Sequence, residues 1–140
     1  MDDFVADAIY IDASPARVFS ALLEPQEVVE WMDANEARIA PGVGGEFTVL
    51  RNDGSTLAGS IAELIDGKRL RLDDYYFERG AERRGPMFVT FILEPRDEGV
   101  WITVRQDGLN TGDGWEDFAH GTRREWVRAT VALKRLIEQI

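Results

Sequence analysis

The sequence predicts an α+β fold in which a curved antiparallel sheet of about six to seven strands surrounds one long C-terminal helix. Three observations support this prediction. Segments of alternating apolar and polar residues follow one another from residue 36 to residue 107 with only short polar turns between them, which is typical of an antiparallel meander. Two short helical segments precede them, after a first strand. From residue 115 onward, apolar residues recur every three or four positions, as on one face of a helix.

The length and composition indicate one domain over residues 1–140. A chain of 140 residues with 44% apolar residues is long enough to bury a core without disulfides or a structural metal. No internal repeat, low-complexity tract or Pro/Ser-rich linker divides it.

The first strand is expected over residues 5–12, where isoleucines alternate with polar residues. Ser14 is a favourable helix N-cap, and Pro15 fits the first helical position because its missing N–H needs no partner there. Pro25 ends this helix and begins a second short one. Two short helices therefore follow the first strand.

The middle of the chain predicts six further strands. Turn residues separate them, including the hairpin signal Asn52-Asp53-Gly54. The expected strands lie at 37–40, 47–50, 57–65, 69–77, 88–94 and 100–107. The stretch 78–86 is charged, contains glycine and has no periodicity, so it is expected to be a loop. A sheet of this length should curve, and the last helix should cover its concave face.

The last helix has the clearest pattern in the sequence. Its apolar positions are Trp115, Phe118, Ala119, Thr122, Trp126, Ala129, Thr130, Leu133, Ile137 and Ile140, and charged residues occupy the opposite side. Gly121 interrupts this pattern and costs about 1 kcal/mol relative to Ala in a helix. The regular helix is therefore expected to begin at Thr122, with a separate turn before it.

Charge and composition exclude several classes of function. Twenty-six acidic against sixteen basic residues leave a net charge of −10, which disfavours both nucleic acid and an anionic membrane surface as partners. The absence of cysteine excludes disulfides and thiolate sites. The acidic N-terminus lacks the pattern of a signal peptide, and no apolar run reaches the length of a membrane span. A soluble, cytoplasmic protein is expected.

Several short motifs occur in a fixed order along the chain. They are Ile11-Asp12-Ala13-Ser14-Pro15-Ala16-Arg17-Val18-Phe19, Glu30-Trp31-Met32, Gly44-Gly45-Glu46-Phe47, Gly59-Ser60-Ile61-Ala62-Glu63-Leu64 with Arg69-Leu70, and Gly114-Trp115. In order and spacing they resemble the START/birch-allergen (SRPBCC) superfamily with its helix-grip fold, and especially the homologues of the activator of heat-shock protein 90 ATPase. The resemblance covers about residues 5–140. Met32 departs from it, because many members have a second tryptophan there.

The resemblance implies a cavity between the curved sheet and the last helix, which opens near the short helices and the start of the last helix. The function that it implies is binding of a small hydrophobic molecule, since such pockets are mostly apolar with a few polar groups. The expected lining residues are Trp31, Phe47, Leu72, Tyr76, Phe88, Trp115, Phe118 and Trp126, with hydroxyl groups from Thr90, Thr122 and Tyr76. Each of them, taken alone, is also explained as an ordinary core residue.

An enzyme on the same scaffold, such as a cyclase or hydrolase, is the first alternative. Strand alternation places Asp74 and Tyr76 on the side of the leucines that precede them. An aspartate beside an apolar cavity has a raised pKa and can act as an acid or base. His120, the single histidine, is the third candidate. Solvated positions are the simpler interpretation of all three.

A protein-interaction module similar to the heat-shock activator domain is the second alternative, and a homodimer is compatible with either. The eukaryotic activators carry an additional N-terminal domain for which this chain has no room, so that activity is the weakest implication. Arg123, Arg124 and Arg128 form a small basic patch on the last helix. They are expected to pair with nearby glutamates, and an acidic ligand or partner is the alternative.

No cofactor and no metal are expected. One histidine without cysteine makes a zinc site improbable. Gly42-Val43-Gly44-Gly45 lacks the Gly-Lys-Ser/Thr ending of a phosphate-binding loop and leads into a strand, so it is interpreted as a turn. No Ser/His/Asp triad or paired-carboxylate motif is evident.

Overall fold

The computed structural model describes residues 4–139, and every predicted strand and helix is present in the predicted order. The elements are β1 (Phe4–Ile11), α1 (Pro15–Leu23), α2 (Pro25–Trp31), β2 (Ala34–Ile39), β3 (Glu46–Arg51), β4 (Thr56–Ile65), β5 (Arg69–Arg79), β6 (Glu82–Arg96), β7 (Gly99–Asp107) and α3 (Trp115–Glu138). Ile140, which the pattern assigns to the last helix, lies outside the described residues.

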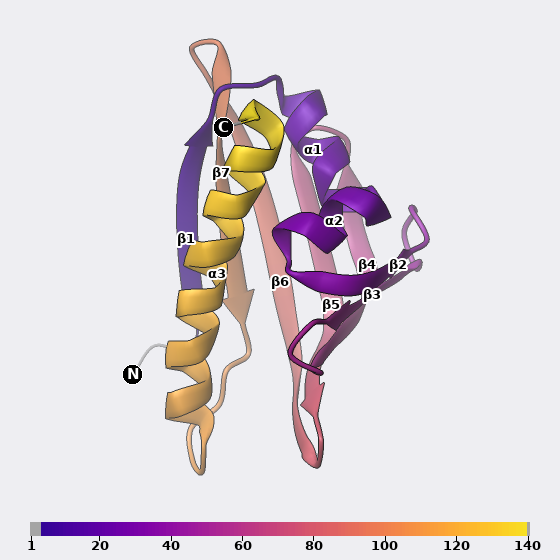
Figure 1. The fold of residues 1–140 in the computed structure, drawn as a ribbon, viewed down its shortest axis with the longest axis vertical. Helices are drawn as coiled ribbons and strands as arrows, with labels where there is room; N and C mark the ends of the chain where they lie inside the picture. Colours follow the sequence, from indigo (N-terminus) through magenta and orange to yellow (C-terminus); the bar gives the residue numbers. More distant parts are fainter. Residues whose placement is uncertain (1–3, 140) are drawn as a thin grey trace.

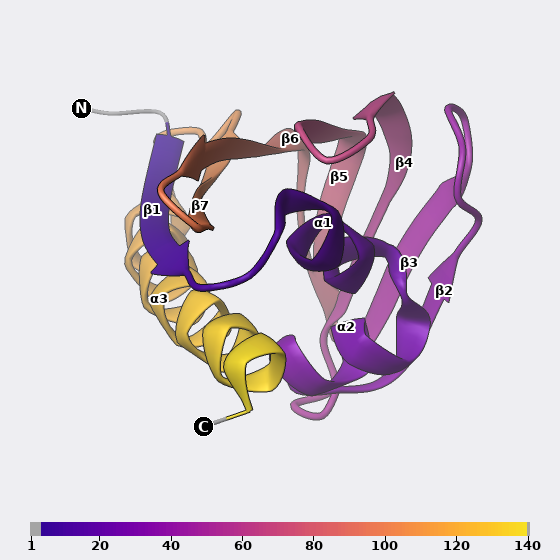
Figure 2. The same cartoon turned by 90° about the horizontal axis from the view of Figure 1, so that it is seen from above.

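The seven strands pair antiparallel in one sheet, in the order β1-β7-β6-β5-β4-β3-β2. From β2 to β7, each strand pairs with its neighbour in the sequence. β1 instead pairs with β7 and forms the edge of the sheet opposite β2. Seen from above, the sheet curls around α1 and α2, and α3 lies beside β1 on the open side (Figure 1, Figure 2). The predicted α+β helix-grip arrangement is confirmed.

The two short helices begin at the predicted capping residues. The Ser14 hydroxyl oxygen accepts a hydrogen bond from the backbone N–H of Arg17 at 3.1 Å, and Pro15 occupies the first helical position. Pro25 opens α2 in the same way. The indole N–H of Trp31, at the end of α2, donates to the carbonyl of Ala21 in α1 at 2.9 Å, which holds the two helices together under the sheet.

Three polar contacts fasten the C-terminal half of α3 to β1, which runs in the same direction (Figure 1). The Thr130 hydroxyl donates to Asp7 at 2.7 Å, and the Lys134 ammonium donates to the carbonyl of Tyr10 at 2.7 Å. The backbone N–H just after β1, of Asp12, donates to the Glu138 carboxylate at 2.7 Å. The helix is therefore fixed along the edge strand over its last two turns.

Aromatic side chains join α3 to the core beneath it. Phe91 of β6 contacts Trp31 and Trp126 edge-on, with ring centroids 6.3 Å and 5.7 Å apart. The Trp126 indole N–H donates to the side-chain oxygen of Gln106 at 2.9 Å, and Gln106 is itself 3% exposed. The buried amide and the buried indole thus satisfy each other, as burial of polar groups requires.

The last helix begins at Trp115 and continues through Gly121, so the prediction that it starts at Thr122 is wrong. Trp115 and Phe118 pack edge-on at 5.6 Å in the first turn, and this contact offsets the helical cost of glycine. Gly114 precedes the helix with φ of 79°, a left-handed conformation that favours glycine. The guanidinium of Arg84 lies where a larger residue would place its Cβ.

The stretch 78–86 is not the predicted loop. β5 continues to Arg79 and β6 starts at Glu82, so only a tight turn separates the two strands. Cross-strand partners include Glu78 opposite Arg83. This hairpin extends past the body of the sheet (Figure 1). Burial therefore does not impose an apolar alternation on it, and the sequence pattern that identifies the other strands is missing here.

A β-bulge at Asp74 reverses the orientation of the residues that follow it in β5. Asp74 has φ of 49°, and the register of β5 against β6 shifts between Leu72 and Tyr75. One extra residue moves every later side chain to the other face of a sheet. Tyr75 is consequently buried, Asp74 is exposed and Tyr76 lies on the outer face. The prediction that Asp74 and Tyr76 share the side of the leucines is wrong.

No helix in residues 4–139 combines the length and the apolar character that a membrane span requires.

Trp126→Ala should lower the free energy of unfolding by about 3–5 kcal/mol, because it removes a buried aromatic ring and the partner of Gln106. Chemical denaturation measures this change, provided that the dependence of the unfolding free energy on denaturant concentration is the same for the variant and the parent. Val127→Ala, one position along the helix at a side chain 47% exposed, is the matched control and should change stability by less than about 0.5 kcal/mol. A loss below about 1 kcal/mol for Trp126→Ala would contradict the packing described here.

Glu138→Gln should destabilise the protein at neutral pH and not in acid. The backbone N–H of Asp12 and the ammonium of Lys134 hold the pKa of Glu138 below its ordinary value. A carboxyl whose pKa is lower in the folded state adds stability above its unfolded pKa, and that stability is lost as the pH falls through the folded pKa. The difference in Tm between the parent and Glu138→Gln should therefore shrink from about pH 5 toward about pH 3. Glu116→Gln, at a side chain 80% exposed, is the control and should show no such dependence.

Candidate functional site

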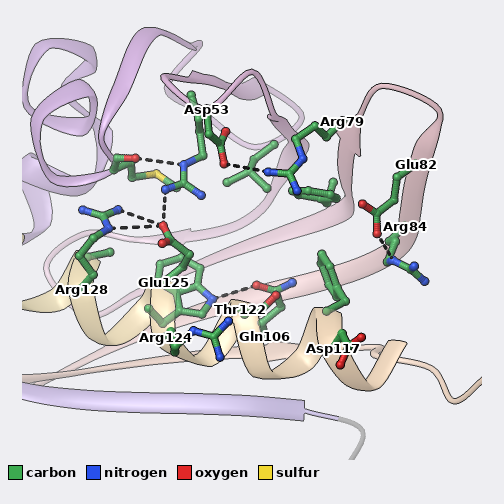
Figure 3. A pocket seen from close by; sticks show the side chains of 18 of the residues that line it. Asp53, Arg79, Glu82, Arg84, Gln106, Asp117, Thr122, Arg124, Glu125 and Arg128 are labelled. Atoms are coloured by element: carbon green, nitrogen blue, oxygen red, sulfur yellow. Dashed lines mark hydrogen bonds and ion pairs between the residues drawn. The ribbon is translucent and has the colours of Figure 1, made fainter. Parts of the chain in front are cut away.

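A pocket of about 530 Å³ lies between the N-terminal half of α3 and the facing strands, and it is partly open to solvent. α2 contributes its C-cap residue, β3 to β7 contribute the sheet side, and α3 contributes the opposite wall (Figure 3). The lining residues are Met32, Arg51, Asp53, Leu57, Tyr75, Phe77, Arg79, Glu82, Arg84, Gln106, Gly114, Asp117, Phe118, Gly121, Thr122, Arg124, Glu125, Trp126, Arg128 and Ala129.

The interior of the pocket is apolar. Met32 is 5% exposed, and Leu57, Phe77 and Phe118 are partly buried side chains that pack on the core. The rings of Phe77 and Phe118 meet edge-on at 5.1 Å, which joins β5 to α3 across the pocket. Trp126 forms the boundary between this space and the solid core. These side chains give a ligand an apolar surface to bury against.

Ion pairs surround the mouth of the pocket. Arg79 of β5 faces Asp53, in the turn between β3 and β4, at 3.5 Å, and Glu82 pairs with Arg84 at 2.7 Å (Figure 3). Burial raises the pKa of Asp53, but the hydroxyl and N–H of Ser55 and the charges of Arg51 and Arg79 together hold it below its ordinary value. Asp53 is therefore ionised at neutral pH.

Arg84 connects the β5–β6 hairpin to the start of α3. Its side chain is 15% exposed, and one Nη atom donates to the carbonyl of Asp113 at 3.3 Å. The guanidinium also lies 5.0 Å from the ring centroid of Trp115 and 5.7 Å from that of Phe118. The contact fixes the pocket-forming turn of α3 against β6.

Elsewhere on the pocket wall, two arginines share one carboxylate. Arg51 of β3 pairs with Glu125 of α3, and Arg128 lies 3.3 Å from the same Glu125 oxygen (Figure 3). The Nε of Arg51 donates to the carbonyl of Met32 at 3.2 Å, and its side chain is 10% exposed. β3, α2 and α3 therefore meet at this guanidinium.

Tyr75 contributes a polar atom to this otherwise apolar interior. The side chain is 2% exposed, and its hydroxyl makes no hydrogen bond with any other residue of the range 4–139. Burial raises the pKa of this hydroxyl far above its ordinary value, and the charge of Arg51 only partly opposes that shift. The phenol is therefore neutral at physiological pH and available as a hydrogen-bond donor.

Of the side chains that the resemblance assigns to a cavity, Phe118, Thr122 and Trp126 line this pocket. Trp31, Phe47 and Leu72 lie in the solid core, each at most 2% exposed. Trp115 packs on Phe118 beside the mouth. Three others lie on the outer face of the sheet: Tyr76, Phe88 and Thr90.

The outward position of those three residues has a geometric reason. In β6 the odd-numbered positions, such as Phe91, contact the core, so that Phe88 and Thr90 point away from α3. The guanidinium of Arg71 covers the Phe88 ring at 4.2 Å. The bulge in β5 turns Tyr76 outward in the same way. Their expected place in the cavity wall is therefore corrected.

The weak catalytic candidates do not meet in the structure. Asp74 is exposed at the bulge, and Tyr76 packs under Arg83 at 3.9 Å from the ring centroid, outside the pocket. His120 lies on the surface of α3 with a side chain 65% exposed, 4.0 Å from Glu116. Within residues 4–139, no three His, Asp or Glu side chains gather as metal ligands.

Sequence reasoning singled out Arg124 and Arg128, which line the pocket, and the expected pairing of Arg128 with a nearby glutamate is confirmed at Glu125. It missed the charged strand residues and the buried tyrosine of the pocket. Arg51, Arg79 and Arg84 lie on strands, where alternation alone assigns them no role. Tyr75 was assigned to the wrong face because nothing but the Asp73-Asp74 pair at the strand end signals a bulge. Aspartate tolerates positive φ better than most residues do, and that was the available signal.

Helices gripped by a curled sheet, with a pocket at one end of the long helix, define a START-like protein of the helix-grip type. Within that class, the chain belongs to the family described as activator of Hsp90 ATPase homolog 1-like proteins, whose model matches residues 12–138. A comparison with curated proteins finds no significant match.

Solved structures share the same fold. Protein MLL2253 from Mesorhizobium loti is 21% identical with a TM-score of 0.81, and 97% of each chain is covered. The Aha1 dimer from Colwellia psychrerythraea is 20% identical with a TM-score of 0.76, and 96% of each chain is covered. DynU16, from the dynemicin biosynthetic locus, is 18% identical with a TM-score of 0.81, and the match covers 99% of this chain and 48% of that one. At these identities the likeness concerns the fold.

Proposed function

We propose that this protein binds a small molecule with a hydrophobic body in the pocket between α3 and the sheet. The observation that carries the proposal is the pocket itself. Its volume of about 530 Å³ lies within the range of small-molecule sites, and apolar side chains form its interior. A close-packed core would leave no such space under α3. Membership of a helix-grip family, whose scaffold is compatible with ligand binding, supports the same proposal.

Binding without catalysis is the form of the proposal that the site supports best. The Tyr75 hydroxyl has no partner among the described residues, and its raised pKa makes it a poor base. Three of the four carboxylates that line the pocket, Asp53, Glu82 and Glu125, are engaged in ion pairs. Asp74 and His120 lie outside the pocket.

The test uses N-phenyl-1-naphthylamine, a neutral probe whose fluorescence rises in apolar surroundings. We expect saturable binding, and a rise in Tm when probe is added, because a ligand seen only by the folded state stabilises it by about 2.7 kcal/mol at 100 times its Kd. Thr122→Trp fills the pocket and should weaken binding at least about 10-fold. His120→Trp, on the exposed side of the same helix and outside both grooves, is the matched control and should bind like the parent.

Equal binding by the parent, Thr122→Trp and His120→Trp would place the probe elsewhere and contradict the proposal. Absence of any saturable binding by the parent would contradict it as well. Circular dichroism of the two variants confirms that each retains the fold.

As a second candidate we propose self-association through the outward face of α3. Val127 and Val131 are 47% and 37% exposed, and with Ala132 and Leu136 they line a shallow groove next to Glu30 of α2. The relative from Colwellia psychrerythraea is described as a dimer. Light scattering should give twice the chain mass for the parent and the chain mass for Val131→Glu. A parent that is monomeric at every concentration would contradict this candidate.

A further inference from the structure

The pocket carries an excess of positive charge in a protein that is strongly acidic. Five arginines and four carboxylates line it, which leaves one net positive charge, whereas the whole chain has a net charge of −10. At the mouth, Arg84 pairs with Glu82 and Arg79 with Asp53, whose carboxylate also interacts with the charge of Arg51. Of the remaining arginines, Arg51 is the deepest, at 10% side-chain exposure.

Arg51 is only partly neutralised. Its carboxylate partner, Glu125, also pairs with Arg128, so that two guanidinium groups share one negative charge (Figure 3). Its Nε and one Nη atom are engaged, by the Met32 carbonyl and by Glu125. The Nη1 atom makes no hydrogen bond within residues 4–139. A cationic donor of this kind, at the wall of an apolar space, is well placed for an anionic acceptor.

Tyr75 provides a second donor on the same pocket wall. It is 98% buried, its hydroxyl has no partner among the described residues, and the charge of Arg51 acts on it. The hydroxyl is not among the fully buried unpaired polar atoms of the described residues, so it reaches the space of the pocket, where a ligand atom can accept its hydrogen bond.

These two donors together indicate which class of ligand the pocket binds, if the proposed ligand-binding function holds. We propose that the natural ligand is a carboxylic acid with a hydrophobic body, and that Arg51 and Tyr75 bind its carboxylate inside the pocket. The guanidinium supplies charge and the free N–H donors of Nη1, and the phenol donates a further hydrogen bond. The body of the ligand packs along Leu57, Phe77 and Phe118.

Two unbranched competitors with ten carbon atoms each test this proposal. Decanoate and 1-decanol each displace N-phenyl-1-naphthylamine from the parent protein, and their inhibition constants are compared at neutral pH. A charge-assisted hydrogen bond is stronger than a neutral one, so decanoate should bind about 10-fold more tightly than decanol. Decanol serves as the measure of the apolar contribution alone.

Arg51→Gln should abolish this preference for decanoate and leave the affinity for decanol within about 2-fold of the parent. Tyr75→Phe keeps the ring and removes the donor, and should reduce the preference about 3-fold. The matched controls are Arg17→Gln and Tyr76→Phe, and both should behave like the parent. Arg17 of α1 pairs with Glu27 of α2, and Tyr76 lies on the outer face of the sheet.

The outcomes separate the two proposals. If probe and decanol bind but decanoate binds no better, the ligand-binding function stands and the carboxylate proposal is overturned. If the preference survives both Arg51→Gln and Tyr75→Phe, these residues do not bind the carboxylate. If neither the probe nor either competitor binds the parent, the proposed function fails and this inference fails with it. Tyr75→Phe keeps the test valid should Arg51→Gln fail to fold.

Discussion

The hydrogen bond between Trp126 and Gln106 is the contact on which the arrangement of the interior depends. Both side chains are almost fully buried, and neither has another strong hydrogen-bonding partner at that depth. The bond therefore sets the distance between α3 and β7 where it forms. On one side of it the Trp31, Phe91 and Trp126 rings fill the interior. On the other side the sheet and the helix separate, and the pocket begins.

The fastening of α3 is uneven along its length, and this unevenness positions the site. Its C-terminal half is held by Thr130, Lys134 and Glu138 against the edge strand. Its first turns depend instead on Arg84 and on ring contacts of Phe118. The pocket lies between these turns and the sheet. The same helix thus closes the core with one half and forms a pocket wall with the other.

The fold followed from the sequence because its signals are local and repeated. Alternation, capping residues such as Ser14 and Pro15, and the spacing on α3 each specify an element, and motif order supplied the topology. The pocket lining followed only in part: the family resemblance implied a cavity lined by Phe118, Thr122 and Trp126, and these three residues line the pocket. The one-residue bulge at Asp74 determines that Tyr75, and not Tyr76, faces inward. The alternation of apolar and polar residues in the sequence does not reveal such a bulge.

The rim of the pocket is built from side chains that the core does not use. Asp53, Arg79 and Glu82 come from a turn and from a hairpin that projects past the sheet, and their side chains are 46%, 54% and 37% exposed. Substitutions at such positions usually change stability little. Over evolutionary time, descendants of this chain can therefore exchange rim residues, and so change the shape and charge of the pocket mouth, while the scaffold stays intact.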